Sequence, residues 1–426
     1  MLGLLRQRNM ALLWVGGLIS LVGDWVLLTA LPYYVYQLTN SLLATAAMTV
    51  IQLAPAVILS SVAGAFVDRW DRKATLVICN LLQSCIVLLL LLVHSTMWLW
   101  TVYVVVCVQA TVSIFVAPAE HALLPRLVTQ DDLTTANSLF GLSNQLARLL
   151  GPPLGGALLA WFGIDPVVVL DSGSFLIVAV MLVCLAQASF SPLYRNTTTA
   201  TRSVSTLKRG WADFWREWVQ GWKLIREKPL LMRLMLVLGI MTFGGTMIDP
   251  LFPAFVKDIM RAGPLAFGWI LTVQAIGGIM GGLVVGHLGG RVPTIRLLAW
   301  GNALVGGLLL IQYNVPVLPV ALLIALLLGP EQVATGVALQ TLMQTSVENS
   351  YQGRLFGAMS TTGALLSMLG GASAGPLGER IGIVPALNVT ALLTLLAAGI
   401  AFVALPGTEH PTTRTKRAEQ GTPPPK

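Results

Sequence analysis

The sequence predicts an all-α integral membrane protein with twelve transmembrane helices in two six-helix, pseudo-symmetric bundles. Of its 426 residues, 55% are hydrophobic and 10% are charged, whereas soluble domains carry about 25% charged residues. The apolar residues form continuous runs of about 20, enough to cross a bilayer core of roughly 30 Å. Continuous runs indicate helices, because membrane barrel strands alternate apolar and polar residues. A polar stretch divides the runs into two sets of six.

The twelve expected helices are separated by polar turns or by turns that contain Gly and Pro. They cover residues 11–38, 42–65, 74–93, 97–119, 135–162 and 167–188, then 231–256, 265–288, 294–313, 315–342, 355–374 and 383–405. We expect the eleventh to end at Gly375 and Pro376, because proline removes a backbone donor. The expected domains are an N-terminal bundle (1–188), a cytoplasmic linker (189–230), a C-terminal bundle (231–405) and a disordered cytoplasmic tail (406–426) rich in Pro and Thr.

Short internal matches indicate that the two halves are related. The segment PYYV at 32–35 recurs as PAFV at 253–256, and Gly64 and Arg69 recur as Gly286 and Arg291. These matches follow the order of the helices, which favours a parallel six-plus-six repeat.

The distribution of Lys and Arg predicts the orientation in the membrane. If the N-terminus is cytoplasmic, 22 of the 26 Lys and Arg residues lie in cytoplasmic segments, in agreement with the positive-inside rule. We therefore expect a multi-pass protein of the cell membrane with both termini in the cytoplasm. The net charge of +8 follows from this topology and does not indicate a nucleic-acid partner.

The linker contains a candidate amphipathic helix. Trp211, Trp215, Trp218 and Trp222 recur at three- and four-residue spacing, which places them on one helix face, as in helices that lie at a membrane surface. Packing of this helix against the protein's own cytoplasmic loops is the alternative. The four cysteines lie in apolar runs without a CxxC pair, so we expect them to pack rather than to form disulfides or bind metal.

The stretch GAFVDRWDRK at 64–73 places five charges between the second and third apolar runs. It matches the pattern G-x-x-x-D-R-x-x-R-[RK] at Gly64, Asp68, Arg69, Arg72 and Lys73. In this pattern and position the chain resembles the major facilitator superfamily, and the resemblance covers nearly its whole length.

Further stretches resemble one branch of that superfamily. GPPLGG at 151–156, in the fifth run, is similar to the antiporter signature of drug/proton exporters. APAEHALLPRLVTQDDLTTANSL and EWVQGWKLIREKPLL resemble the macrolide-efflux and siderophore-export permeases. The fourth run departs from the pattern, since it lacks the embedded Arg of many drug/proton antiporters.

The resemblance implies a secondary transporter that works by alternating access. It would export amphiphilic small molecules of drug, macrolide or siderophore type, with the proton gradient as energy source and no cofactor. Gly64, Asp68, Arg69, Arg72 and Lys73 would form a conformational gate, in which Asp68 meets the positive N-terminal end of the eleventh helix near residues 353–355. We expect the protein to be a monomer, with protons, substrate and membrane lipids as its partners.

The GPPLGG stretch also has a mechanical interpretation. Proline kinks a helix, and glycine lets two helices approach closely. Gly151, Pro152, Gly155 and Gly156 would therefore let the fifth helix roll against the other half. Ordinary packing of a glycine-rich membrane helix is the alternative.

Two charged residues lie at equal depth within the membrane. Asp24 and Arg148 each lie 13 residues beyond the start of their helices, roughly 20 Å in at 1.5 Å per residue. The resemblance implies that these helices are neighbours, which predicts a buried Asp24–Arg148 pair. The pair would either fix helix packing or let Asp24 exchange a proton under the influence of Arg148.

Four other acidic residues lie in or next to the apolar runs, and different roles are expected for them. Glu331 and Asp249 are candidates for proton coupling or for binding a cationic substrate, because an ionisable residue within a span costs roughly 2.5–3.5 kcal/mol. Glu120, at the cytoplasmic end of the fourth helix, is expected to be solvated. Asp171, near the outer end of the sixth, is expected to act as a local cap.

The remaining candidates are aromatic residues of the substrate cavity, with core packing as the alternative: Trp25, Tyr33, Tyr34, Phe243 and Phe252. The sequence has no phosphate-binding GxxxxGK[ST] loop and no metal-ligand spacing among its four histidines, so we expect neither an enzyme nor an ATP-driven pump. A lipid or lysolipid flippase or an uptake facilitator on the same fold is the first alternative function. A non-transporting membrane scaffold or sensor is the second.

Overall fold

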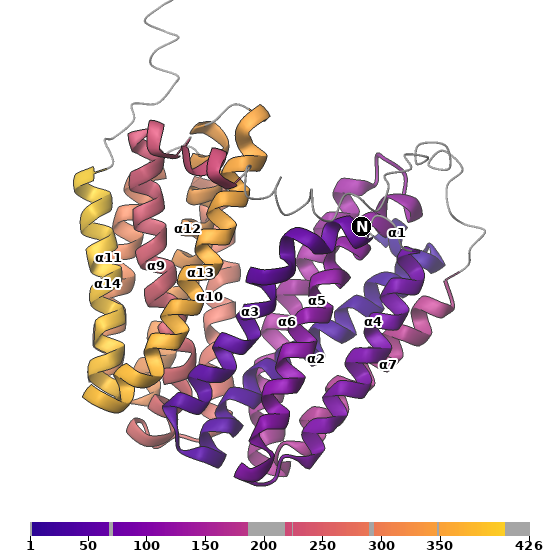
Figure 1. The fold of residues 1–426 in the computed structure, drawn as a ribbon, viewed down its shortest axis with the longest axis horizontal. Coiled ribbons are helices and arrows are strands. Elements are labelled where there is room, and N and C mark those ends of the chain that lie inside the picture. The colour runs from indigo at the N-terminus through magenta and orange to yellow at the C-terminus, as the bar shows by residue number, and fades with distance from the viewer. Residues whose placement is uncertain are drawn as a thin grey trace, which may run out of the picture.

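The computed structural model describes residues 2–67, 71–185, 218–223, 225–288, 294–346 and 349–404, and the regular structure in these ranges is helical. Twelve long helices carry the fold (Figure 1). They are α2 (Arg8–Thr39), α3 (Leu42–Val67), α4 (Arg72–Val87), α5 (Leu99–Leu127), α6 (Leu133–Phe162) and α7 (Asp165–Val183), followed by α9 (Pro229–Ala254), α10 (Pro264–Leu288), α11 (Thr294–Asn314), α12 (Leu318–Ser346), α13 (Asn349–Ile381) and α14 (Ile383–Ala404). Shorter segments are α1 (Leu2–Leu5), the 3-10 turns η1 (Leu88–Leu92) and η2 (Thr96–Trp98), and the π-helical turn η5 (Phe255–Ile259).

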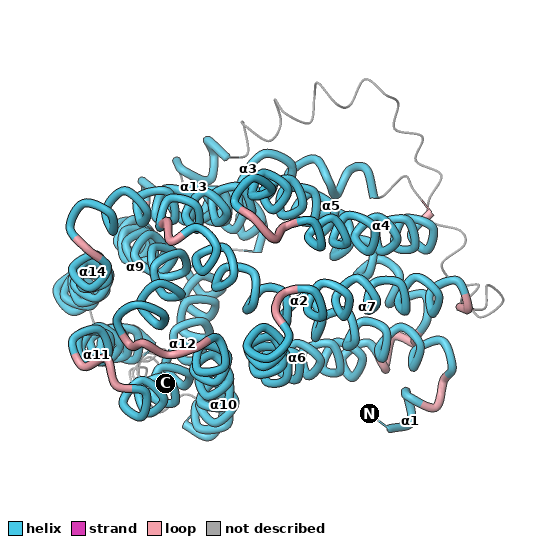
Figure 2. The backbone as a smooth tube through the Cα atoms, turned by 90° about the horizontal axis from the view of Figure 1, so that it is seen from below, coloured by secondary structure: helices cyan, strands magenta, loops and turns pink. Residues whose placement is uncertain are grey.

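The long helices form two groups of six that lie side by side (Figures 1 and 2). We call α2–α7 the N-terminal bundle and α9–α14 the C-terminal bundle. In the N-terminal bundle, α2 packs on α6 and α7, α3 on α5, and α4 on α5 and α7. The C-terminal bundle repeats each pair six helices later: α9 packs on α13 and α14, α10 on α12, and α11 on α12 and α14. The predicted pseudo-symmetry is therefore visible in the packing order.

The repeat extends to individual side chains. In α4, the Asn80 Nδ2 donates to the carbonyl of Leu76 at 2.8 Å; in α11, the Asn302 Nδ2 donates to the carbonyl of Leu298 at 2.7 Å. Both asparagines are buried, and they are 222 residues apart, as are the two carbonyls. Gly64 and Gly286 of the sequence repeat are separated by the same number of residues.

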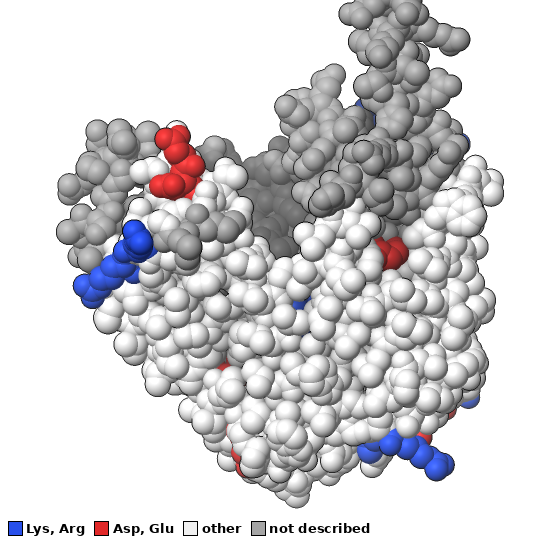
Figure 3. Space-filling view, turned by 180° about the vertical axis from the view of Figure 1, so that it is seen from behind, with Lys and Arg blue, Asp and Glu red and all other residues white. Residues whose placement is uncertain are grey.

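The outer surface is suited to a membrane. Charged side chains gather near the two ends of the molecule, and the broad band between them is almost free of charge on the face drawn in Figure 3. Large apolar side chains of the long helices are exposed, among them Ile78 of α4 (64%) and Trp300 of α11 (67%). Such continuous apolar exposure is typical of a surface that contacts lipid rather than water.

Nine helical segments among the described residues are long and apolar enough to cross a membrane, and they belong to α2, α3, α4, α5, α7, α9, α10, α12 and α14. The remaining long helices are α6, α11 and α13. Both α6 and α13 are rich in Gly, Ser, Thr and Asn and pack on helices of the other bundle. Their composition reflects contact with protein rather than with lipid.

Prolines do not end the helices where the sequence suggested. Helix α5 continues through Pro118 and Pro125, and α13 continues through Pro376 to Ile381. The predicted end of the eleventh helix at Gly375 and Pro376 is therefore wrong. Proline is tolerated within membrane helices because neighbouring helices and local adjustments satisfy the backbone groups that it frees.

One residue of the charge-rich stretch and one residue of the turn between α2 and α3 cap their helices. The Asp71 Oδ1 accepts from the backbone N–H of Ala74 at 2.8 Å and so caps the start of α4. Helix α2 ends at Asn40, which has a left-handed backbone (φ 49°) and donates its N–H to the carbonyl of Tyr36 at 2.8 Å. These two caps fix how the chain enters and leaves the helices next to the candidate gate and the closed end.

The two bundles meet at one end and separate at the other (Figure 1). The N-terminus lies at the end where they separate, and the turn between α2 and α3 lies where they meet; we call these the open end and the closed end. At the closed end the Tyr33 hydroxyl donates to the carbonyl of Ala262 at 3.0 Å, and the Thr45 hydroxyl donates to the carbonyl of Pro250 at 3.1 Å. Hydrogen bonds from the N-terminal bundle therefore hold the C-terminal bundle there.

The π-helical turn η5 adds a second set of contacts at the closed end. The Tyr36 hydroxyl donates to the carboxylate of Asp258. The Lys257 Nζ donates to Asn40 Oδ1 at 2.5 Å and lies 5.2 Å from the centre of the Tyr36 ring. The closed end is thus held by polar contacts that water could replace one at a time.

Two tryptophans of the linker lie within the described residues, and Trp211 and Trp215 lie outside them. Trp218 and Trp222 contact each other, with ring centres 6.1 Å apart, and pack against a cluster of the C-terminal bundle that includes Leu231 and Leu234. For these two residues the structure therefore favours packing on the protein itself, the alternative considered from the sequence.

Candidate functional site

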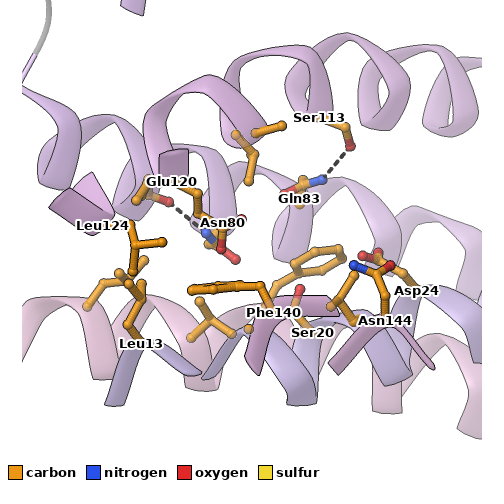
Figure 4. Close-up of a pocket in the computed structure, with 18 of the residues that line it drawn as sticks. Leu13, Ser20, Asp24, Asn80, Gln83, Ser113, Glu120, Leu124, Phe140 and Asn144 are labelled. Carbon is orange, nitrogen blue, oxygen red and sulfur yellow. Dashed lines mark hydrogen bonds between the residues drawn. The ribbon is translucent and has the colours of Figure 1, made fainter. Parts of the chain in front are cut away.

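A cavity of about 340 Å³ lies inside the N-terminal bundle, between α2, α4, α5, α6 and α7 (Figure 4). Its polar lining consists of Ser20, Asp24, Asn80, Gln83, Ser113, Glu120, Asn137 and Asn144. Aliphatic residues together with Phe140 and Phe175 form the rest of the wall. Among the described residues that line it are two carboxylic acids and no Lys, Arg or His.

The two carboxyl groups come from different helices and face the same space. Asp24 of α2 is partly buried and lies beside Asn144, and Glu120 of α5 lies towards the opposite end of the cavity, near Asn80 (Figure 4). They are close enough for the charge of Glu120 to act on Asp24. Gly17 of α2 lies beside Glu120, since a Cβ there would be in ordinary contact with its Oε1, at 3.8 Å.

Glu120 corrects an expectation from the sequence. It was expected to be a solvated charge at the end of its helix, but α5 continues beyond it to Leu127 and its side chain lines the cavity. The helix was expected to end at residue 119, which placed Glu120 just beyond it, and no sequence pattern signalled the additional turns of α5.

Amide and hydroxyl groups complete the polar wall. The Gln83 Nε2 donates to the Ser113 Oγ at 3.2 Å and so joins α4 to α5 (Figure 4). The Asn80 amide is held against its own helix by the bond to Leu76. Two acids that face one cavity repel each other when both are ionised. The arrangement can therefore bind a proton or a positively charged group.

Arg148 does not pair with Asp24 in this structure. Its Nη2 donates to Gln332 Oε1 of α12 at 3.1 Å, and its guanidinium lies 5.4 Å from the centre of the Trp25 ring. The predicted buried ion pair is therefore not formed. Both residues lie at similar depths, but depth alone does not set the direction of a side chain. Arg148 points across the boundary between the bundles, and Asp24 points into the cavity.

The two acidic candidates of the C-terminal bundle occupy different surroundings. Glu331 of α12 accepts a hydrogen bond from the Thr335 hydroxyl and packs against α11, where a Cβ on Gly301 would lie 3.2 Å from its Oε1. Asp249 of α9 is exposed in this structure and its charge acts on the fully buried Tyr313. The structure does not bring these two acids together with Asp24.

Several aromatic residues that were predicted to line the substrate cavity are instead packed against other residues. Tyr33 and Phe252 both stack near Phe267 of α10, with ring centres 5.7 and 5.8 Å apart. The Tyr34 hydroxyl donates to the carbonyl of Val93 at 2.5 Å, within the N-terminal bundle.

Trp25 and Phe243 lie elsewhere. Trp25 lies beneath Arg148 at the boundary between the bundles. Phe243 packs beside Gly370, where a Cβ would collide with the Phe243 carbonyl.

The GPPLGG stretch lies in α6 and contacts two helices. A Cβ on Gly155 would lie 2.5 Å from the Val26 carbonyl of α2, and one on Gly151 would collide with Trp25. On the other face, a Cβ on Gly156 would lie 2.5 Å from the carbonyl of Pro264, and one on Gly268 of α10 would collide with the carbonyl of Pro152. The stretch therefore packs backbone against backbone, both within its bundle and across to the other.

Part of the candidate gate can be placed. Gly64 lies in α3, whereas Asp68 and Arg69 lie outside the described residues. The Arg72 Nη1 donates to the carbonyl of Ala122 at 2.9 Å. The Lys73 Nζ donates to the carbonyls of Val183 and Leu185 at 3.0 and 2.8 Å. These two basic residues thus tie α4 to α5 and to the end of α7.

The family model described as Major Facilitator Superfamily matches residues 13–371 and 234–426. The chain is 25% identical to the MFS-type transporter YfiS of Bacillus subtilis (strain 168), over 93% of each chain. It is 24% identical to the multidrug efflux pump Tap of Mycolicibacterium fortuitum (94% of this chain, 96% of Tap) and 22% identical to macrolide efflux protein A of Streptococcus pyogenes (84% and 85%).

Solved structures share the fold. A nucleoside transporter, NupG, matches with a TM-score of 0.75 at 14% identity, over 94% of this chain and all of that one. A bacterial homologue of the iron transporter ferroportin, in an inward-facing state, matches with a TM-score of 0.73 at 16% identity, over 93% and 98%. These identities support the fold and carry no information about substrate.

Proposed function

Because the chain belongs to the Major Facilitator Superfamily, we propose that it is a proton-coupled exporter of small amphiphilic molecules that works by alternating access. The observation that carries the proposal is the cavity of the N-terminal bundle, which Asp24 and Glu120 share and whose described lining residues include no basic residue. The relatives named as macrolide and multidrug efflux proteins support export as the direction. No cofactor is needed, because the proton gradient supplies the energy.

The orientation follows from the distribution of basic residues. We place both termini in the cytoplasm, so the open end faces the cytoplasm and the closed end faces outwards. In this state a substrate enters between the bundles from the cytoplasm or the inner lipid leaflet. We propose that the protein acts as a monomer in the cell membrane, with lipids, protons and substrate as its partners.

The cycle requires the closed end to separate while the open end closes. The hydrogen bonds from Tyr33 and Tyr36, and the backbone contacts of Gly156 and Gly268, would be broken on opening. We propose that Asp68 then contacts the N-terminal end of α13 at the end that was open before. Together with Gly64, Arg69, Arg72 and Lys73 it would bias the equilibrium between the inward-open and outward-open states. A charge–dipole contact of this kind contributes about 0.3–1 kcal/mol.

In this proposal Asp24 carries the transported proton and Glu120 adjusts its affinity. Ionisation of one carboxyl group makes ionisation of the other less favourable, so the pair holds a proton more readily than either acid alone. Release of that proton to the cytoplasm, when the cavity communicates with the open end, would complete the inward movement of one positive charge.

Arg148 and the boundary aromatics are proposed to sense and contact substrate. Arg148 bridges the bundles through Gln332 and covers Trp25. Tyr34 and Phe243 remain candidate contacts, and Tyr33 and Phe252 become available only when the closed end opens. Glu331 and Asp249 would contribute to binding of a cationic group from the C-terminal side.

The experiment uses inside-out membrane vesicles that contain the protein, with ethidium and radiolabelled erythromycin as probes. We expect both probes to accumulate when the vesicle interior is acidic, and the accumulation to collapse when nigericin removes the pH gradient. Exchange of labelled for unlabelled probe should persist without a gradient.

Three results would contradict the proposal. Equilibration of the probes with no accumulation would indicate an uptake facilitator. Movement of a fluorescent lysophospholipid, but of neither probe, would indicate a flippase. No flux of any of the three compounds would indicate a scaffold or sensor.

A further inference from the structure

A third acid of the N-terminal bundle lies apart from the cavity. Asp171 is in the interior of α7, six residues after the helix begins at Asp165, and is fully buried. Neither of its carboxyl oxygens accepts a hydrogen bond of normal geometry from the described residues. The expectation that Asp171 acts as a local helix cap is therefore wrong, and its burial needs another explanation.

The helices around Asp171 bring a small set of charged and polar groups near it. From α2, Asp24 is the ionisable group that acts on it, and from α5 the amide of Gln109 approaches without forming a normal hydrogen bond. From α4, Ser84 is engaged with Ser172, at 3.0 Å between the two hydroxyls. Arg148 of α6 is directed to Gln332 and Trp25. The neighbour that can exchange a proton with Asp171 is therefore Asp24.

Gly23 is what allows the two acids to approach. A Cβ on Gly23 would lie 2.8 Å from Asp171 Oδ1 and 2.5 Å from Ser174 Oγ. Any side chain there would displace the carboxyl group. Asp24 follows directly in the chain, and its side chain reaches the cavity. The two carboxyl groups thus lie on either side of the contact between α2 and α7, one sealed from water and one in the cavity.

The burial of Asp171 determines which protonation state of its carboxyl group is favoured. A buried carboxylate without hydrogen bonds or a counter-ion costs far more than a neutral polar group in the same place, and acids in membrane spans recur in the proton relays of transporters. The neutral acid is the form that this site supports. It carries a proton that the cavity pair could receive.

We infer that Asp171 is a relay residue that passes the transported proton to Asp24; this rests on the proposed function. In the step, the O–H bond of the Asp171 acid breaks and an O–H bond forms on the Asp24 carboxylate. Asp171 is left as a carboxylate, and the proposal requires α2 and α7 to move apart enough in the outward-open state for water to reprotonate it. The unfavourable charge on Asp171 ensures that it is reloaded before the next cycle.

The test compares two variants with two matched controls. Asp171→Asn removes the titratable group, and Gly23→Ala places a methyl group against Asp171. The control Ser172→Ala alters the neighbouring buried hydroxyl, and Gly16→Ala alters the same α2–α7 contact, where the new Cβ would meet the flexible Met181 Sδ at 3.3 Å. All four are purified and reconstituted as full-length protein.

Two measurements are made on each. Infrared spectroscopy in H₂O and D₂O detects the C=O stretch of a neutral, buried carboxylic acid, and requires no transport. Ethidium accumulation driven by a pH gradient, set against gradient-free ethidium exchange, measures coupling, and its dependence on pH is recorded.

We expect Asp171→Asn to lose one neutral-acid band and at least about tenfold of the driven accumulation, while exchange persists. Gly23→Ala should shift the band and displace the pH profile of accumulation. Both controls should match the wild type.

The outcomes separate this inference from the proposed function. If the wild type does not accumulate ethidium or erythromycin with a gradient, the proposed function fails, and the band still reports whether Asp171 is a neutral acid. If Asp171→Asn retains the band, or retains driven accumulation with an unchanged pH profile, the relay is wrong. If Asp171→Asn does not fold, Gly23→Ala decides, and an unchanged band and profile in that variant would also overturn the inference.

Discussion

The two bundles share one frame but differ in the chemistry that the frame holds. They repeat the same helix pairs and the same asparagine-to-carbonyl bond at Asn80 and Asn302. In the N-terminal bundle, Asn80 lines a cavity with Asp24 and Glu120. In the C-terminal bundle, Glu331 lies against Gly301, next to Asn302, but a hydroxyl of its own helix occupies its carboxylate.

This difference indicates how a protein built from two similar bundles can drive transport in one direction. The packing needed to form and move two similar bundles is duplicated. The acids are not: Asp24 and Glu120 line one cavity of the N-terminal bundle, and Asp171 of the same bundle is buried against Gly23, next to Asp24 in the chain. A symmetrical frame can rock between two states, and an unsymmetrical set of acids can couple that motion to a gradient.

The largest effect is expected when equivalent changes are made to the acids of the two bundles. Asp24→Asn should lower gradient-driven efflux about a hundredfold or more, since a positioned proton carrier contributes about that much. Glu331→Gln should lower it much less, because Thr335 already engages that carboxylate. Initial rates of gradient-driven ethidium accumulation in inverted vesicles, where export moves the probe into the lumen, measure both. The reverse ranking would place proton coupling in the C-terminal bundle.

The next largest effect concerns the boundary between the bundles. Gly268→Ala adds a Cβ that collides with the Pro152 carbonyl, and forced overpacking costs about 1–3 kcal/mol. Since about 1.4 kcal/mol is a tenfold change in an equilibrium, we expect the closed end to open in a large fraction of molecules. The control is Gly245→Ala in α9, where a Cβ meets nothing within 4 Å.

Spin labels would measure this opening. Cysteines introduced at Met97 and Val317, with the four native cysteines replaced, label the closed-end turns of the two bundles. The distance between labels should lengthen in Gly268→Ala and not in Gly245→Ala. An unchanged distance distribution would show that the glycine contact does not hold the closed end.

A smaller effect should distinguish contacts between bundles from contacts within one. Tyr36→Phe removes the hydroxyl that donates to Asp258 of the other bundle, and because water can replace this bond, its net contribution is about 0.5–1.5 kcal/mol. Tyr34→Phe removes a hydroxyl that bonds within the N-terminal bundle. The same spin-label distances should respond to the first change alone. Equal responses would mean that the tyrosines act through general stability.

The smallest effect compares the repeated asparagines themselves. Asn80→Ala and Asn302→Ala each remove one hydrogen bond to a carbonyl of the same helix, so each should lower stability by a similar amount, about 1 kcal/mol. Only Asn80→Ala should also change the pH dependence of efflux, because only Asn80 lines the carboxyl cavity. Thermal unfolding in detergent and a pH series of efflux rates test the two halves of this prediction.

Much of the fold could be predicted from the sequence, because membrane helices can be recognised in it as continuous apolar runs. The expected range 135–162 agrees closely with α6 (Leu133–Phe162). The ends failed at prolines, as in α5 and α13, since the stop signal of soluble helices does not hold where neighbouring helices supply partners.

The candidate site was harder to predict from the sequence than the fold, because it depends on which way each side chain points. The prediction that Asp24 lies within a span was correct, but the prediction that Arg148 is its partner was wrong. Arg148 lies at the right depth but on the face of α6 that meets α12. Glu120 and Asp171 were judged by their distance from helix ends, and burial there is set by helices distant in sequence. No local pattern encodes a cavity between five helices.

The glycine contacts at the closed end have a consequence for the solvent. Where Gly156 meets Gly268, the buried surface is largely backbone, including the carbonyls of Pro152 and Pro264. When this seam parts, those carbonyls need new hydrogen-bond partners, and water is the available one. Each turnover must therefore draw water into the seam and expel it again. Transport by this chain should slow under osmotic stress, in proportion to the water that the seam takes up.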